Sequence, residues 1–156
     1  TNHDPVKDRT GEAVVTCRRV GAGMIVAIHG ELFRDYYRAH YPLARQLIGA
    51  LIDRMGIRWA VEVEGPPRLE LVLRQRDETM LINLINRGAG EALSPRRVIV
   101  EELPPITDVI LHVPRDTAPT AVQAVPSDTP LAWDYSSGML TLRVPRLDIH
   151  TVIAVR

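Results

Sequence analysis

The segment that most constrains the fold of this chain runs from Leu69 to Asn86, LELVLRQRDETMLINLIN. In each of its two halves apolar residues occupy every second position, which is the period of strands that have one face on a core. These residues are Leu69, Leu71 and Leu73 in the first half and Met80, Ile82 and Leu84 in the second. A charged triplet at 76–78 separates the halves. The segment therefore predicts a β-hairpin in a β-sheet domain.

Two asparagines stand in the second half of this hairpin. Asn83 lies on the face opposite Ile82 and Leu84, between two aliphatic neighbours. If that face is buried, its amide needs hydrogen-bond partners inside the protein. Asn86 is placed where the strand ends, and asparagine is common in turns. Both asparagines are interpreted as structural residues rather than as ligand-binding residues.

The chain after Gly56 consists of further short strand-like segments separated by Pro, Gly, Asp and Ser, as is typical of sandwiches and barrels. These segments are 58–64, 96–103, 106–113, 120–125, 131–135, 139–144 and 149–155. The alternation of apolar and polar residues in 139–144 indicates a sheet with one packed face. Since two sheets that cover each other bury such faces, residues 57–156 are predicted to form an antiparallel β-sandwich.

The first part of the chain has a different pattern. Residues 12–19 and 24–29 are β-rich and are joined by a glycine-containing loop, which predicts an antiparallel pair. From 43 to 55 apolar residues recur at helical steps, so one amphipathic helix is predicted, with Pro42 in its first turn and Gly56 just past its end. Residues 30–41 mix charged and aromatic side chains without a clean period and are predicted to form a loop.

Composition limits the partners and cofactors. Nineteen basic and nineteen acidic side chains balance, so the net charge attracts neither nucleic acid nor an anionic membrane. The single cysteine, Cys17, excludes an internal disulfide, and no Cys or His pair has the spacing of a zinc site, so no cofactor is predicted. No apolar run is long enough to span a bilayer, and no secretion signal is visible, which favours the cytoplasm.

Three groups of residues are candidates for a chemical site. Cys17 lies within a strand segment rather than on a sharp turn, where nucleophiles are exposed, so a plain strand cysteine is favoured. Glu62 and Glu64 share one strand face, whereas a glycosidase pair must straddle its substrate, so a solvated face is favoured. Trp133, Asp134 and Tyr135 have the composition of a carbohydrate-binding site, because sugars stack on aromatic rings beside polar groups. The alternative is that Trp133 and Tyr135 share a face and cap the sandwich.

The order of these segments resembles the C-terminal region of glycoside-hydrolase-like proteins. Val20-Gly-Ala-Gly-Met24, the His29-Gly30-Glu31 segment and Pro42-Leu43 before LARQLIGALIDRMG are similar to the end of the amidotransferase-like, flavodoxin-like domain that serves for trimerisation in family 42 β-galactosidases. The strand 61–66, the hairpin ending in Met80-Leu81-Ile82-Asn83-Leu84-Ile85-Asn86 and the pattern over 138–155 continue the likeness.

The resemblance implies two regions. Residues 1–56 are expected to be the C-terminal remnant of an amidotransferase-like α/β domain, and residues 57–156 the sandwich. In such proteins catalysis belongs to an N-terminal (β/α)8 barrel that this sequence lacks, so no catalytic residue is carried over. Because the sequence begins at Thr1 rather than Met, it is expected to be a piece of a longer protein.

The leading hypothesis is a non-catalytic structural or assembly region of a bacterial glycoside-hydrolase-like protein. Its partners are then the remainder of the parent chain or a second copy in a homo-oligomer. The alternative is a carbohydrate-binding module that uses Trp133, Asp134 and Tyr135. A third hypothesis, a small enzyme that uses Cys17, predicts that Cys17→Ser abolishes turnover.

Overall fold

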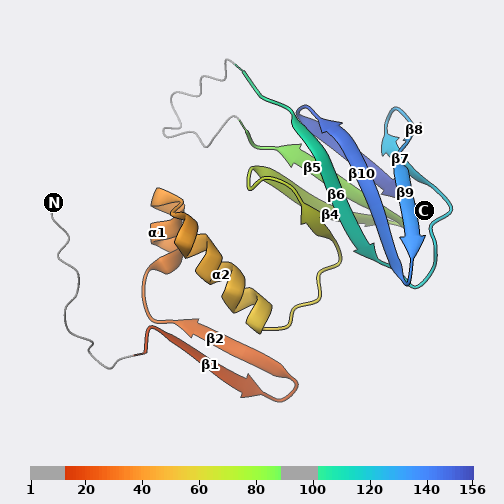
Figure 1. Ribbon diagram of the computed structural model, residues 1–156. Coiled ribbons are helices and arrows are strands. Elements are labelled where there is room, and N and C mark those ends of the chain that lie inside the picture. The colour runs from red at the N-terminus through yellow and green to blue at the C-terminus, as the bar shows by residue number, and fades with distance from the viewer. Residues whose placement is uncertain (1–12, 89–101) are drawn as a thin grey trace. The chain divides into compact units, whose positions relative to one another are not determined.

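The computed structural model describes residues 13–88 and 102–156, and its content is mainly β with two helices (Figure 1). The chain divides into two compact units, Thr1–Arg58 and Trp59–Arg156, called unit 1 and unit 2 below. Each unit is described by itself. The mainly β architecture that the sequence predicts is confirmed.

Unit 1 contains a β-hairpin and two helices in sequence. Strands β1 (Val15–Val20) and β2 (Gly23–Ile28) pair antiparallel across a two-residue turn, as predicted. Gly21 holds the first position of this turn with a φ of 57°, a conformation that costs glycine little because it has no Cβ. The helices α1 (Leu32–Ala39) and α2 (Pro42–Arg54) follow directly.

Helix α2 begins and ends at the predicted residues. Pro42 stands in its first turn, where the missing N–H has no intrahelical partner to lose. Gly56 follows the helix with a φ of 67°, the left-handed conformation that ends many helices.

The prediction of a loop over residues 30–41 was wrong, because α1 occupies most of that segment. An eight-residue helix has only about two turns, so its apolar residues repeat too few times to give a clear period. The left-handed His40, with a φ of 48°, ends α1, and its backbone N–H donates to the Tyr36 carbonyl at 2.7 Å. The side chains of Tyr36 and His40 also meet edge to face at 5.4 Å between ring centroids.

The described part of unit 1 has no buried core. None of the side chains of residues 13–58 is buried, and α1 and α2 contain no buried residue. Large apolar side chains are exposed on both strands, on both helices and beside them, namely Val14, Val20, Ile25, Phe33, Tyr37, Tyr41, Leu43, Leu47, Met55 and Ile57.

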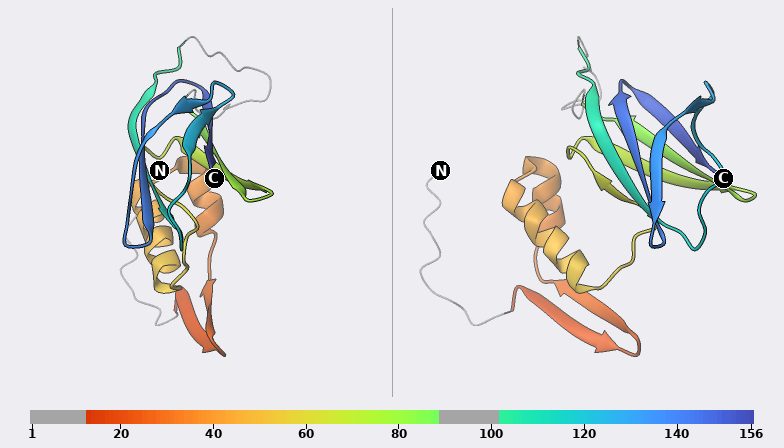
Figure 2. Two further views of the ribbon diagram at one scale, coloured as in Figure 1. Left: turned by 90° about the vertical axis from the view of Figure 1, so that its right-hand side faces the viewer. Right: turned by 45° about the vertical axis from the view of Figure 1, so that its right-hand side comes forward.

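Unit 2 is a sandwich of two antiparallel sheets, which lie as two layers (Figure 2). Four strands form one sheet in the order β3-β6-β10-β9, and five form the other in the order β4-β5-β11-β7-β8. The strands are β3 (Glu62–Glu64), β4 (Leu69–Arg76), β5 (Thr79–Asn86), β6 (Ile106–Pro114), β7 (Val122–Val125), β8 (Thr129–Pro130), β9 (Ala132–Ser136), β10 (Met139–Leu147) and β11 (His150–Val155).

The predicted hairpin at 69–86 is confirmed as β4 and β5, which pair over their whole length. Asp77, with a φ of 54°, starts the tight turn between them, a conformation that Asp tolerates better than most residues. The turn carbonyl of Asp77 accepts a hydrogen bond from the Gln75 side chain at 2.6 Å.

The core lies between the two sheets and uses the alternate residues that the sequence pattern selects. Leu140, Leu142 and Val144 of β10 are almost completely buried, whereas Arg143 on the other face is exposed. Their cross-strand partners on β6 are also buried. Burial of each such side chain contributes roughly 1.5 to 3 kcal/mol. The other core residues include Ile82, Leu84, Ile106, Val109, Leu111, Val113, Val122, Leu147, Ile153 and Val155.

The structure corrects one further predicted segment, and another lies mostly outside the described residues. The connection predicted at 145–148 was placed too early, because β10 continues through Pro145 to Leu147. Pro145 lies opposite Asp108, whose φ of 58° departs from strand geometry, and no pair forms there although the register holds on both sides. The strand predicted at 96–103 lies almost entirely outside the described residues.

The two asparagines of β5 differ in burial. Asn83 is half-buried, and its amide donates to the carbonyl of Val72 at 3.1 Å. Asn86 is 5% exposed and is the buried polar residue of the described sandwich. Its amide donates to the carbonyls of Pro104 at 2.9 Å and Asp148 at 2.8 Å, and its side-chain oxygen accepts from Gly88 N at 2.9 Å. One side chain thus joins three separate segments.

Candidate functional site

The predicted carbohydrate-binding residues lie on β9, where strand geometry separates them. Trp133 and Tyr135 pair with the buried Leu142 and Leu140, so they face the side of the sheet that carries the core. Asp134 pairs with Thr141 and therefore faces the opposite side. The structure thus brings two of the three residues together and places the third on the other face.

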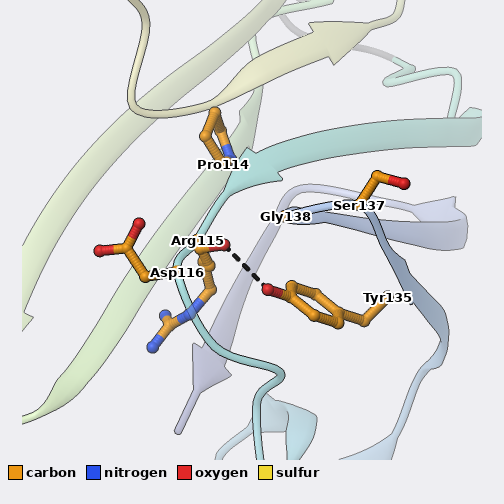
Figure 3. A pocket seen from close by; sticks show the side chains of 6 residues that line it. All are labelled: Pro114, Arg115, Asp116, Tyr135, Ser137 and Gly138. Atoms are coloured by element: carbon orange, nitrogen blue, oxygen red, sulfur yellow. Dashed lines mark hydrogen bonds between the residues drawn. The ribbon is translucent and has the colours of Figure 1, made fainter.

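The ring of Tyr135 is half-buried against the core and borders a hollow at one end of the sandwich (Figure 3). Its hydroxyl donates a hydrogen bond to the carbonyl of Arg115 at 3.0 Å. The backbone N–H of Arg115 in turn donates to the Gly138 carbonyl at 2.9 Å. The residue after β6 is therefore fixed to the turn between β9 and β10.

The sequence forms this turn through Ser137 and Gly138. Both have positive φ, 52° and 80°, as the two central residues of a type I′ hairpin turn require. The hollow has a volume of about 480 Å³. It is lined by Pro114, Arg115, Asp116, Tyr135, Ser137 and Gly138.

The lining combines an aromatic ring with a guanidinium, a carboxylate and a hydroxyl, group types that bind sugar hydroxyls. Figure 3 shows the Arg115 and Asp116 side chains on the same side as the Tyr135 hydroxyl, whereas the Ser137 hydroxyl points away from them. Trp133 and Asp134 do not belong to this lining.

Sequence reasoning missed Arg115 and Asp116. They follow strand β6 in a loop between Pro114 and Pro119, and this loop meets Tyr135 only because β6 and β10 pair. The sequence shows two charged residues in a loop bounded by prolines. Such a loop does not reveal which residues of other strands lie beside it.

A second polar arrangement lies on the outer face of the four-stranded sheet. The Glu64 carboxylate lies 2.8 Å from Nε2 of His112, and Nδ1 of His112 lies 3.3 Å from the Thr141 hydroxyl. A carboxylate, an imidazole and a hydroxyl in series also occur in nucleophilic triads. Here, however, β10 pairs on both sides, so its backbone N–H groups are not free to stabilise an oxyanion beside Thr141. The arrangement is explained by cross-strand polar pairing.

The remaining candidate residues form no catalytic or metal-binding cluster among the described residues. Cys17 lies on β1 with an exposed, free thiol. His29 of unit 1 lies 2.9 Å from the Thr16 hydroxyl through its Nε2. Within residues 13–88 and 102–156, no three or more His, Cys, Asp or Glu side chains are placed to hold a metal ion. Neither helix in that part of the chain is long and apolar enough to cross a bilayer.

Comparison with known proteins gives a likeness of fold. No protein-family model and no curated protein matches this sequence. Among solved structures, the whole chain matches part of the alpha-L-fucosidase isoenzyme 2 from Paenibacillus thiaminolyticus, with a TM-score of 0.76 and 18% sequence identity. The match covers 24% of that enzyme's chain. This chain is therefore similar in fold to a fraction of a longer glycoside hydrolase.

Proposed function

We propose that this chain is a non-catalytic accessory region of a glycoside-hydrolase-like protein, with a structural role in its folding or assembly. The observation that carries the proposal is the exposed apolar surface of unit 1, which has no buried side chain among its described residues. A two-stranded hairpin is marginally stable alone, and so is a 13-residue helix such as α2. Unit 1 therefore needs a further surface against which to pack.

The proposed source of that surface is the remainder of a longer parent chain. The fold of the present chain accounts for 24% of the fucosidase chain that it matches, so a protein of that kind contains ample additional structure. Apolar side chains on both β1 and β2 and on both helices fit a buried position between larger elements. The competing candidates are the sandwich of the same chain and a second copy of this chain in a homo-oligomer.

The first test uses Leu47 of α2, which is 41% exposed. The chain produced alone is expected to bind a hydrophobic dye and to self-associate, because its apolar surface is uncovered. Leu47→Lys should weaken this association about tenfold, since burying a leucine contributes roughly 1.5 to 3 kcal/mol. Light scattering coupled to size-exclusion chromatography measures the change.

Gln46→Lys is the matched control, because it adds the same charge at an adjacent exposed position of α2. A defined oligomer that Leu47→Lys dissociates would identify a second copy as the occupant. Heterogeneous association with strong dye binding would support the missing parent surface. A monodisperse monomer that binds no dye would contradict the proposal.

The proposal further predicts that the chain alone hydrolyses no aryl α-L-fucoside or aryl β-galactoside above the buffer rate. Glycoside hydrolysis commonly uses two carboxylates that flank the bond to be cleaved. Glu62 and Glu64 instead lie side by side on one exposed strand, and Glu64 is engaged by His112. Release of the chromophore is the measurement. Turnover that Glu64→Gln abolishes would overturn the non-catalytic assignment.

The alternative function is carbohydrate binding beside Tyr135. The observation that favours it is the combination of the polar hollow with Trp133, which is 39% exposed and shares the strand face of Tyr135. Such a site offers an aromatic surface for a sugar ring and charged groups for its hydroxyls.

Calorimetric titration with a panel of oligosaccharides tests this alternative. Trp133→Ala and Asp116→Ala are each expected to weaken binding of any recognised sugar about tenfold, a loss of about 1.4 kcal/mol. Asp134→Ala is the control, because Asp134 faces the other side of β9 and should leave the affinity unchanged. Equal losses from Asp134→Ala would instead support the three-residue site predicted from the sequence. Absence of binding to every sugar removes the alternative.

A further inference from the structure

A second hollow lies on unit 2 and plays no part in the proposed function. Its volume is about 590 Å³, within the range of small-molecule sites. It is lined by Arg76, Asp77, Thr79, Leu81, Val125, Pro126, Val152, Ala154 and Arg156. These residues come from the turn between β4 and β5, from the end of β7 and from β11 with the residue after it.

The floor of this hollow is the outer face of the five-stranded sheet. Leu81 pairs with Ala154, and Val152 pairs with Val125, so all four share one face. Ile82 and Ile153, which alternate with them, point into the core. Ala154 is 2% exposed although it lies on the outer side, and the other three are half-buried. The floor is therefore aliphatic, and the lining contains no aromatic ring on which a sugar could stack.

The rim of the hollow is charged. It carries two guanidinium groups, of Arg76 and Arg156, and one carboxylate, of Asp77. Neither guanidinium forms a hydrogen bond or ion pair with any described residue. This contrasts with Arg87 on the same sheet, which binds Glu70 at 2.7 Å. The lining side chains thus have a surplus of one positive charge beside an aliphatic surface.

We infer that this hollow binds an aliphatic carboxylate. A guanidinium pairs with a carboxylate through two parallel N–H···O bonds, and its rigid fork makes that pairing geometrically specific. The alkyl body of the ligand then covers Leu81, Val125 and Val152 and removes their apolar surface from water.

The experiment titrates the full chain and follows backbone amide signals by NMR, with hexanoate as the probe. Hexanol has a similar body without the charge, and acetate has the charge without the body. Hexanoate is expected to shift the signals of the lining residues and to bind at least about tenfold more tightly than either comparison ligand. N-acetyl-leucine, compared with its amide, tests whether the hollow binds a carboxylate and an alkyl group at the C-terminal end of a peptide.

Variants separate the two parts of the site. The double substitution Arg76→Gln and Arg156→Gln should weaken hexanoate binding about tenfold and leave hexanol unaffected. Val152→Thr, which keeps the side-chain shape, should weaken both ligands about threefold. Arg18→Gln, at an exposed position of unit 1, is the control and should change nothing.

The outcomes are decisive in both directions. Stronger binding of hexanoate indicates a free aliphatic acid as the natural ligand, and stronger binding of N-acetyl-leucine indicates a peptide end. Equal binding of hexanoate and hexanol, or shifts located away from the lining, would overturn the inference. So would an unchanged affinity in the double variant, provided that thermal unfolding shows it to be folded.

Discussion

Asn86→Ala is expected to destabilise unit 2 by about 3 kcal/mol. The substitution removes three hydrogen bonds, to Pro104 O, Asp148 O and Gly88 N, and each costs about 1 kcal/mol when its buried partner is left unpaired. Asn86 is 5% exposed, so water replaces these bonds poorly. Urea denaturation is the measurement, with a lower midpoint and an unchanged slope as the expected result.

Asn83→Ala is the matched control for this prediction. Asn83 stands on the same strand but is half-buried and makes one hydrogen bond, to Val72 O. Its loss should therefore cost about 1 kcal/mol. Equal destabilisation by the two substitutions would show that the three hydrogen bonds of Asn86 stabilise unit 2 no more than the one hydrogen bond of Asn83.

Asn86→Asp provides an independent check on the same contacts. An introduced carboxylate keeps the shape and the acceptor but loses the donor that serves two carbonyl oxygens. Burial raises the pKa of such a carboxyl above its unfolded value, so the extra destabilisation is greatest at high pH. It should lessen as the pH falls through the folded-state pKa, because the protonated carboxyl donates one bond. A pH-independent difference from the unsubstituted chain would contradict this account.

Leu142→Ala is expected to cost about 3 kcal/mol, within the 2 to 5 kcal/mol typical of buried leucines. Leu142 is 1% exposed on β10, and its cross-strand partner Leu111 is completely buried. Because the substitution leaves a cavity between two sheets, its neighbours relax only partly. For a unit of this size the melting temperature should fall by roughly 12 to 24 °C, at about 4 to 8 °C for each kcal/mol.

The control for Leu142 is Leu43→Ala, the same chemical change at a side chain that is 59% exposed. It should leave the melting temperature of unit 2 nearly unchanged, since little apolar burial is lost. Scanning calorimetry of both variants provides the comparison. A similarly small change in both would mean that the sandwich core is packed too loosely to sense the cavity.

The sequence predicts the strands of unit 2 well because their signal is local. In β10 the apolar Leu140, Leu142 and Val144 alternate with other residues, and these three are buried as predicted. In β5 Ile82 and Leu84 are likewise buried, although the alternate positions also include aliphatic residues. Which strands become neighbours is not a local property. The order β3-β6-β10-β9 joins β3 to β6 and β6 to β10, which are far apart in the sequence, and no alternation pattern encodes these neighbours.

The difference between local and non-local signals also explains which residues of the candidate site could be predicted. Tyr135 and the Ser137-Gly138 turn are recognisable from adjacent residues, whereas Arg115 joins them through pairing across 20 positions. The two asparagines show a related limit. A need for buried partners was predicted for Asn83 and not for Asn86, yet Asn86 is the buried one, because its partners Pro104 and Asp148 come from remote segments. The origin of residues 1–56 in an amidotransferase-like domain remains a prediction.

The contacts of Asn86 also have a consequence for how this fold can be altered. Its side chain holds Gly88 N on one side and Pro104 O on the other, so the two ends of the connection between β5 and β6 are fixed at a single point. Loss of the Asn86 side chain therefore frees both ends of this connection together, whereas a change at Gly88 or at Pro104 affects one end.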